Sequence, residues 1–570
     1  MSESDIGWDF HLRKLSASGR DSNTANDPSL LLSVKKLHEL CKTQNSHDLV
    51  ARVFPPINKI FQRAVASLSQ SRTSNGLLLL AILQFYLDFG EIVLHDADPS
   101  LRMFFRSCLS REFADPVVAE ATLELLIINK KKLLTSFPNL LPQFFPLLLK
   151  LIAWNGDRLE KLFLKAFPGL MSPESFIPLF PPLVDLPILL VALEKVEKSS
   201  GPLIGSNIAS IQKNTAPKML LALMDEAYTG STIEDVGGDV YSRAIDVSDP
   251  LFLELLKDEN DGIAVWLPFI LLITERPWSS PVMVSILKAA NNPYSDKLKA
   301  VLSMAPRLLD VYFSIALHNV NKSSVCALIP LLMSRFATIF PDKIFSYEVR
   351  KRLLEFMLST FQHSPNFIAV LKKPIMNRLG EAYDSPDKTE LALQLCWAIG
   401  EHGGGGGSHK DEARELFESL ELLLYENLST SRLGMTQGVS LSSDKDTCRG
   451  SSQSRLLCFV VTAIAKLATH HRELQPRARV ALGKVARSLI SDARVWRRTC
   501  DFLGLMKDPA ICSSILGPSR SAQGTTQKIG SINWSEGSTK MVAHIPFYIL
   551  GEQEGPPFHD FSFSDIISRR

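Results

Sequence analysis

Long apolar patterns of helical period limit most strongly what this chain can fold into. In 76–94 (GLLLLAILQFYLDFGEIVL) and in 117–134 (VVAEATLELLIINKKKLL), apolar residues recur at three- and four-residue spacing. Windows of this length exceed ordinary strands, and strand-like alternation is nearly absent before the C-terminal part. The sequence therefore predicts an all-α protein of about twenty amphipathic helices, each of roughly 12 to 20 residues.

Several of these helices are expected to begin at a polar residue followed by proline. The polar side chain can cap the first free N–H groups, and proline fits the first turn because its missing N–H is not needed there. The pairs with this pattern are Asp115-Pro116, Ser172-Pro173, Asn292-Pro293 and Ser385-Pro386.

The spacing of the helices predicts a stack of repeats. A chain of 570 residues ordinarily forms several domains, unless small units stack without one central core. Helix pairs recur at roughly 35 to 45 residues, in the range of HEAT and armadillo units. Because such a pair cannot bury both faces alone, we expect an α-solenoid of HEAT/armadillo-like helix pairs.

Composition along the chain predicts where the stack begins, ends and is interrupted. Residues 1–28 are expected to form a flexible N-terminus, 29–516 the helical trunk, and 517–570 a mostly irregular tail in which 540–550 could be extended. Polar segments rich in glycine, serine and threonine predict loops near 229–249, 402–408 and 429–454.

Cysteine usage and hydropathy indicate the compartment. The eight cysteines are scattered without a C-x-x-C pair, which is typical of reduced thiols in the cytosol. The N-terminus has no apolar signal-like region, and the best membrane-span candidate, 176–193, carries four prolines and Asp185. We expect a soluble, cytoplasmic protein.

A run of five glycines, 403–407, suggests a phosphate-binding loop at first sight. Such a loop follows a strand and has lysine directly after its last glycine, with serine or threonine next. Here the order is Ser408, His409, Lys410, Asp411, and the preceding 385–401 has a helical pattern. We interpret the run as a helix connection, with Ser408 and Asp411 capping the next helix.

Metal and catalytic motifs are also missing from the sequence. The histidines that flank the glycines have no partner at zinc spacing, and His470 and His471 are adjacent and point in different directions on a helix. The stretch 258–262 (DENDG) is similar to a calcium loop, but Lys257 and Pro268 would occupy positions that need acids. We expect no metal, no cofactor and no catalytic site, and therefore not an enzyme.

Local charge is more informative than net charge. With 62 basic and 60 acidic residues, the chain lacks the bias of a nucleic-acid binder, so no nucleic-acid partner is expected. Residues 225–261 hold eleven acids against two bases, which indicates a solvated outer face of the solenoid. The eight bases between 472 and 498 face only two acids and form a candidate patch for anionic lipid or an acidic partner; they are Arg472, Arg477, Arg479, Lys484, Arg487, Arg494, Arg497 and Arg498.

Three blocks in order give the chain a family resemblance. The segment 396–401 (CWAIGE) resembles the W-x-x-G-E element in the trunk of adaptin large subunits, and 416–428 resembles the helix that follows it. Blocks at 136–193 and 460–509 also resemble the family, most closely its zeta-type subunits of the fifth adaptor complex. The residues of this trunk signature are Trp397, Gly400 and Glu401.

The resemblance implies a scaffold function. Such a subunit pairs with a sigma-type chain, assembles with beta and mu chains into a heterotetramer, and associates with spastacsin and spastizin. It sorts cargo at late endosomes and lysosomes, peripheral to their membranes. The nearest match to a clathrin box, 183–187 (LVDLP), lacks the terminal acid and lies in an apolar helix, so clathrin binding is not expected.

Two alternatives remain open from the sequence. A karyopherin-like nuclear transport receptor would share the helical stack, although such receptors are usually longer and strongly acidic. A helical enzyme with a site dispersed along the chain would leave no motif to find.

Overall fold

A computed structural model describes most of the trunk region. The residues it describes are 3–18, 28–67, 75–138, 140–171, 176–200, 287–288, 290, 293–383, 386–403, 409–436, 444–488 and 493–516. Every regular element among them is a helix, so the prediction of an all-α chain is confirmed. The predicted loop at 229–249 and the predicted tail at 517–570, with its extended segment 540–550, lie outside the described residues.

The chain divides into two compact units, residues 1–315 and 316–570. The helices of the first unit are α1 Glu3–Ser18, α2 Pro28–Gln44, α3 His47–Ser67, α4 Gly76–Phe89, α5 Asp98–Met103, η1 Phe104–Leu109, α6 Ser110–Glu112, α7 Pro116–Ile128, α8 Lys130–Ser136, α9 Leu140–Asn155, α10 Asp157–Ala166, η2 Phe167–Gly169, α11 Phe176–Val184, α12 Leu186–Ser200 and most of α18 Asp296–Asn319.

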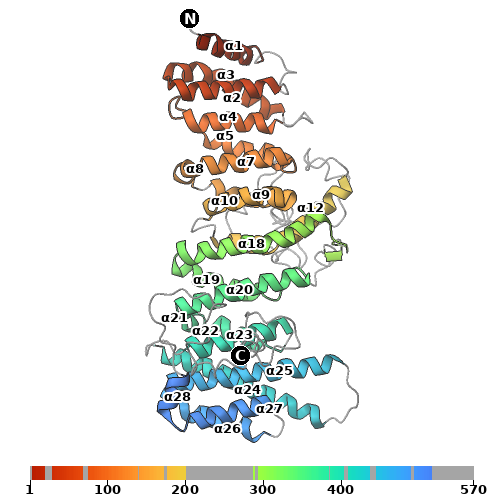
Figure 1. The fold of residues 1–570 in the computed structure, drawn as a ribbon, viewed down its shortest axis with the longest axis vertical. Coiled ribbons are helices and arrows are strands. Elements are labelled where there is room, and N and C mark those ends of the chain that lie inside the picture. The colour runs from red at the N-terminus through yellow and green to blue at the C-terminus, as the bar shows by residue number, and fades with distance from the viewer. Residues whose placement is uncertain are drawn as a thin grey trace, which may run out of the picture. The chain divides into compact units, whose positions relative to one another are not determined.

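These helices stack one above another, as Figure 1 shows from red to green, and their contacts define two layers. In one layer α2 packs on α4, α4 on α7 and α7 on α10. In the other, α3 contacts η1, η1 contacts α9, and α9 packs on α11 and α12. Each layer buries the apolar side of the other, which is how a solenoid obtains a continuous core.

The second unit repeats this arrangement. Its helices are α19 Lys322–Arg335, α20 Lys343–His363, α21 Asn366–Val370, α22 Lys372–Gly380, α23 Pro386–His402, α24 Lys410–Thr436, α25 Asp444–His470, η3 Arg472–Leu474, α26 Gln475–Arg487, α27 Ala493–Leu505 and α28 Pro509–Leu516. One layer runs through α20, α23, α25 and α27, and the other through α19, α22 and α24. The predicted α-solenoid is therefore present in both units.

Side-chain caps fix several helix starts. Asp115 accepts hydrogen bonds from the N–H groups of Val117 (2.8 Å) and Val118, which confirms the Asp-Pro start of α7. Asn321 and Asp342 cap α19 and α20 in the same way. The helical pattern predicted for 117–134 is split at Asn129, where α7 ends and α8 begins.

One described helix, α18, is long and apolar enough to cross a membrane by length and composition. Its Tyr312 is fully buried and stacks on Phe176 of α11, with ring centroids 5.1 Å apart, and donates a hydrogen bond to the Phe176 carbonyl. These contacts are typical of the core helix of a packed unit.

The prediction of a flexible N-terminus is wrong for 3–18. These residues form α1, whose Leu15 is fully buried and whose His11 hydrogen-bonds Ser33 of α2 at 3.1 Å. Trp8, Leu12 and Leu15 are spaced three to four residues apart, which gives the short segment an apolar stripe to bury against α2 and α3.

The predicted loop at 429–454 is also wrong over most of its length. Helix α24 continues to Thr436 and α25 begins at Asp444. Serine and threonine cost a helix only tenths of a kcal/mol each, about 0.5 kcal/mol relative to alanine. Two long helices packed on each other along their apolar parts can therefore extend through such a sequence.

The helices on either side of the glycine run match the expected connection. Helix α23 ends at His402, Gly403 forms a turn, and α24 begins at Lys410. Residues 404–408, and with them the predicted cap at Ser408, lie outside the described part of the chain.

Candidate functional site

The W-x-x-G-E element lies at the end of α23, where it meets α25. The Trp397 ring is partly buried and meets His402 edge-on, with ring centroids 5.8 Å apart. Gly400 is buried, and a Cβ added there would lie 3.1 Å from Cα of Ala463. This is tighter than most Cβ contacts in proteins, so any side chain at position 400 would have to push the α25 backbone away by a few tenths of an ångström.

The glutamate of the element is held by a lysine from the neighbouring helix. Glu401 forms an ion pair with Lys466 of α25, and the two side chains are only 13% and 5% exposed. Removing two charges from water is costly unless they pair closely, so each of these residues depends on the other. The sequence motif contains one half of this contact, and Lys466 supplies the half that sequence reasoning missed.

Two histidines lie close to the end of α23. The backbone of Gly400 acts on the His470 ring and that of Gly403 on the His471 ring, and each raises the pKa of its histidine against the larger effect of desolvation. The last carbonyls of a helix have no partner within it, and they carry negative partial charge that favours a nearby protonated ring. Although adjacent in sequence, both histidines are therefore close to one helix end.

Burial keeps the His402 and His470 rings neutral at pH 7. Desolvation lowers the pKa of His402 to about 4, with a smaller contribution from His470. Desolvation likewise lowers the pKa of His470 to about 4, assisted by His471 and by the charge of Lys466. Near neutral pH, the charges in this part of the α23–α25 contact are therefore those of the Glu401–Lys466 pair.

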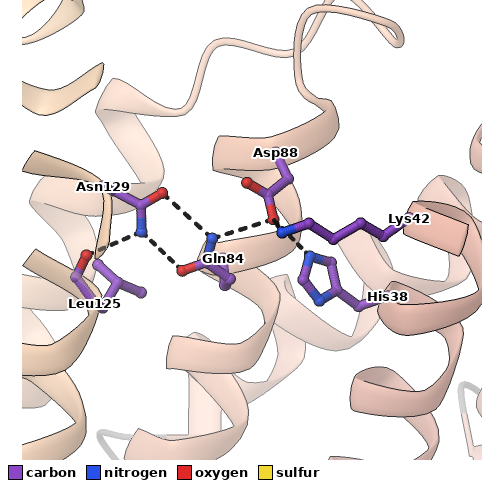
Figure 2. A network of polar contacts seen from close by, with 6 residues as sticks. All are labelled: His38, Lys42, Gln84, Asp88, Leu125 and Asn129. Atoms are coloured by element: carbon purple, nitrogen blue, oxygen red, sulfur yellow. Dashed lines mark hydrogen bonds and ion pairs between the residues drawn. The ribbon is translucent and has the colours of Figure 1, made fainter. Parts of the chain in front are cut away.

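The first unit joins its helices through a polar network at the C-terminal ends of α2, α4 and α7 (Figure 2). Asp88 of α4 accepts hydrogen bonds at its Oδ2 from His38 Nε2 (2.7 Å) and Gln84 Nε2 (3.2 Å). Lys42 Nζ lies 3.5 Å from the same oxygen. Burial would raise the pKa of Asp88, but these hydrogen bonds, with the Lys42 charge, hold it below its ordinary value.

The network continues from α4 to α7 through two amides. Asn129 Nδ2 donates to Gln84 Oε1 at 2.7 Å, and Gln84 Nε2 donates back to Asn129 Oδ1 at 3.3 Å. Asn129 also donates to the Leu125 carbonyl at 2.9 Å, close to the point where α7 ends. Figure 2 shows the resulting line of contacts across three successive helices.

Three of the eight bases in the candidate patch contact other residues of the same protein. Arg477 pairs with Glu418 and Glu421 of α24, and its guanidinium lies over the Phe417 ring. Arg479 donates to the Met506 carbonyl, and Arg498 is half-buried over the Phe502 ring. These three side chains are thus engaged with neighbouring helices.

The other five bases of the candidate patch are exposed. Lys484 donates to the Tyr425 hydroxyl at 3.1 Å, and Arg487 donates to the carbonyl of Gly483 at 3.0 Å. Both acceptors are uncharged, so these hydrogen bonds do not neutralise the two bases. The remaining exposed members are Arg472, Arg494 and Arg497.

In the described ranges, no group of three or more His, Cys, Asp or Glu side chains is placed to hold a metal ion. What the described residues do share is repeated contact between successive helices. A two-layered stack of this kind is the architecture of helical-repeat scaffold proteins, which bind partners along extended surfaces.

Comparison with known proteins identifies the family. A family model described as "AP-5 complex subunit, vesicle trafficking" matches residues 25–150. A second, described as "AP-5 complex subunit zeta-1, C-terminal TPR repeats", matches residues 284–531. The two models match in chain order and together cover more than half of the sequence, so the chain belongs to the family of AP-5 complex zeta subunits.

Two curated relatives agree with this assignment. The AP-5 complex subunit zeta-1 of Mus musculus is 22% identical over 533 residues, which are 90% of this chain and 59% of that protein. The human protein of the same name is 23% identical over 461 residues, 78% of this chain and 50% of its own length. The chain thus spans 50–59% of the length of these relatives, and no solved structure matches it significantly.

The repeat type in the family description differs from the predicted one. The second model names TPR repeats, whereas the sequence pattern predicted HEAT- or armadillo-like pairs. All of these are helix pairs that bury their apolar faces on their neighbours. The α-solenoid follows from either description.

Proposed function

We propose that this chain is a non-enzymatic scaffold, the large subunit of a heterotetrameric adaptor complex that sorts proteins in endosomal and lysosomal vesicle transport. The observation that carries the proposal is the ordered match of two AP-5 family models to separate parts of the chain. The stacked helices of both units support it, since they present long surfaces to partner chains.

The mechanism we propose is geometric. The solenoid binds sigma-, mu- and beta-type subunits of the same complex, and the assembled complex associates with spastacsin and spastizin. It is cytoplasmic and peripheral on late endosome and lysosome membranes, and it involves no nucleic acid. Linking several weak contacts in one assembly raises their combined affinity for cargo and membrane.

We do not propose clathrin as a partner. The nearest match to a clathrin box begins at Leu183, and its side chains are inaccessible: Leu183, Val184 and Leu186 are fully buried and Asp185 is 4% exposed. A short linear motif must be exposed to bind in an extended conformation.

A native pull-down tests the proposed function. The tagged full chain is expressed in cells, and its partners are quantified by mass spectrometry against a tag-only control. We expect sigma-, mu- and beta-type subunits in stoichiometric amounts, and co-localisation of the chain with a late-endosome marker. Recovery of the chain as a monomer without these subunits would contradict the proposal, and recovery with Ran would favour the karyopherin-like alternative.

A further inference from the structure

A half-exposed tryptophan marks the outer side of the α26–α27 pair. Trp496 of α27 is 48% exposed, although tryptophan is on average a well-buried residue. Its indole Nε1 donates to the carbonyl of Ala486 at 3.1 Å, close to the end of α26. The hydrogen bond satisfies the polar atom of the ring and fixes its position, so an apolar surface is presented to the exterior in one orientation.

Apolar and basic side chains share the adjoining surface of α26. Val480 is 54% exposed, and Lys484 and Arg487 follow it at four and seven residues, which places all three on neighbouring positions of one helix side. Arg487 is next to Ala486, which holds Trp496, and Arg497 follows Trp496 on α27.

The positive charge of this surface is not balanced from within the pair. Among the described residues of α26 and α27, Asp501 is the single acid, against seven bases. Arg477 is neutralised by two glutamates of α24, but Lys484 and Arg487 bond to a hydroxyl and a carbonyl, which accept hydrogen bonds without cancelling charge. The surface therefore carries a positive field around an exposed indole.

We propose that Val480, Lys484, Arg487, Trp496 and Arg497, the α26–α27 patch, contact an anionic membrane surface. The inference rests on the proposed function, which brings the complex to a membrane. Tryptophan favours the headgroup level of a bilayer, and each base near an anionic leaflet contributes about 1 kcal/mol of attraction.

A membrane fits this patch better than an acidic peptide. Directional recognition of a carboxylate uses several free N–H groups of an arginine or lysine together. In the patch, Lys484 Nζ and Arg487 Nε each already donate one hydrogen bond to a group of the protein, which leaves fewer N–H groups to fix the orientation of a carboxylate but leaves the charge undiminished. A fluid layer of anionic headgroups requires charge and an apolar anchor, but no fixed arrangement of acceptors.

Vesicle co-sedimentation of the purified full chain tests the patch. The chain is mixed with phosphatidylcholine vesicles, or with vesicles in which part of that lipid is replaced by phosphatidylserine. We expect binding to the anionic vesicles that weakens as salt rises. The double variant Arg487→Glu/Arg497→Glu should bind them roughly tenfold more weakly or worse, given the attraction lost for each base. Trp496→Gln should weaken binding with less change in its salt dependence.

The chain offers a matched control. Lys343 and Ile344 are an adjacent exposed basic and apolar pair outside the patch, and Ile344 is 77% exposed. The variant Lys343→Glu/Ile344→Ala should bind anionic vesicles as the unaltered chain does. Circular dichroism and thermal unfolding of every variant separate lost binding from lost folding.

Two outcomes would contradict the proposal that the α26–α27 patch contacts an anionic membrane. One is equal binding of the charge-reversed variant and the unaltered chain to anionic vesicles; the other is no preference of the unaltered chain for anionic over neutral vesicles. A protein partner lost by the charge-reversed variant while vesicle binding persists would assign the patch to that protein instead. Subunit co-purification reports on the proposed function separately, because the patch variants should leave it intact.

Discussion

The two units use the same two-layered stack but join their helices by different chemistry. In the first unit, one carboxylate and two amides link α2, α4 and α7, and Asp88 remains 24% exposed. In the second, α23 and α25 meet through a buried ion pair, a close glycine contact and buried imidazole rings. Water can replace a lost partner in a partly solvated hydrogen bond, but it cannot reach a buried charge that has lost its counter-charge. The α23–α25 contact should therefore be the more sensitive of the two to substitution and to acid.

The largest expected effect is the loss of one half of the buried ion pair. Lys466→Met leaves the Glu401 carboxylate buried without its counter-charge, and should cost about 3–5 kcal/mol of the free energy of unfolding. Denaturant unfolding, with hydrogen exchange in α23 and α25, measures it. The double variant Lys466→Met/Glu401→Leu should recover most of the loss. If Lys466→Met were as stable as the unaltered chain, the α23–α25 contact would not be more sensitive to substitution than the network of the first unit.

The next largest effect is expected from acid, which should destabilise the α23–α25 contact before the Asp88 network of α2, α4 and α7. The folded pKa of His402 and His470 is about 4 and the ordinary value is 6.5, so the unfolded chain binds more protons between these values. Their contribution to the free energy of unfolding is complete above about pH 6.5 and is lost as pH falls toward 4. Since one pKa unit corresponds to about 1.4 kcal/mol, a shift from 6.5 to about 4 makes the loss about 3 kcal/mol for each histidine.

The Asp88 network of α2, α4 and α7 should respond at lower pH than the α23–α25 contact. The pKa of Asp88 is held below its ordinary value of 3.8, so its contribution is lost only as pH falls below that value. Hydrogen exchange as a function of pH should show α23 and α25 opening before α2 and α4. His402→Phe should flatten the dependence in the second unit, and substitution of the exposed His318 by Gln should not. Simultaneous opening of the α23–α25 contact and the Asp88 network would contradict the assignment.

A smaller effect tests the close approach of α23 and α25. Gly400→Leu forces a side chain against the Ala463 backbone and should destabilise the chain by about 1–3 kcal/mol. Gly504 of α27 is the matched control, because a Cβ there meets nothing within 4 Å. Gly504→Ala should stabilise the helix by up to about 1 kcal/mol. Thermal unfolding gives both values, and equal signs would show that glycine at position 400 is not required by packing.

The smallest expected effect lies in the first unit. Asp88→Asn removes the charge of the network but keeps an acceptor for His38 or Gln84, and should cost about 1 kcal/mol. Denaturant unfolding, read by hydrogen exchange in α2 and α4, measures it. A cost as large as that of Lys466→Met would mean that the first unit depends equally on a buried charge.

The fold was more predictable than the contacts between helices. Periodicity predicted the helices and their stacking, and Asp115-Pro116 marked the start of α7, because these signals act over a few residues. The same reasoning misjudged 3–18, which is helical because α2 and α3 pack on it, and much of 429–454, where α24 and α25 extend through a serine-rich segment. Local composition carries no information about such support.

For the candidate sites, the W-x-x-G-E element was visible in the sequence, but its partners were not. The packing of α25 on α23 brings Lys466, His470 and the following His471 to Glu401, Gly400 and Gly403. The eight bases between 472 and 498 looked equivalent in the sequence, yet side chains such as Arg477 are ion-paired to α24 and Trp496 is left half-exposed. The predicted lipid or partner patch is thereby narrowed to the α26–α27 surface.

By itself, the sequence determined that this chain forms stacked amphipathic helices, and its ordered blocks carried the family resemblance. Both depend on residues close together along the chain. Only the tertiary structure decided which charges are paired, which histidines are neutral and which surface stays positive. These properties depend on burial and on partners that are distant in sequence, such as Glu401 and Lys466, which are 65 positions apart. Packing alone brings such residues together and excludes water from them.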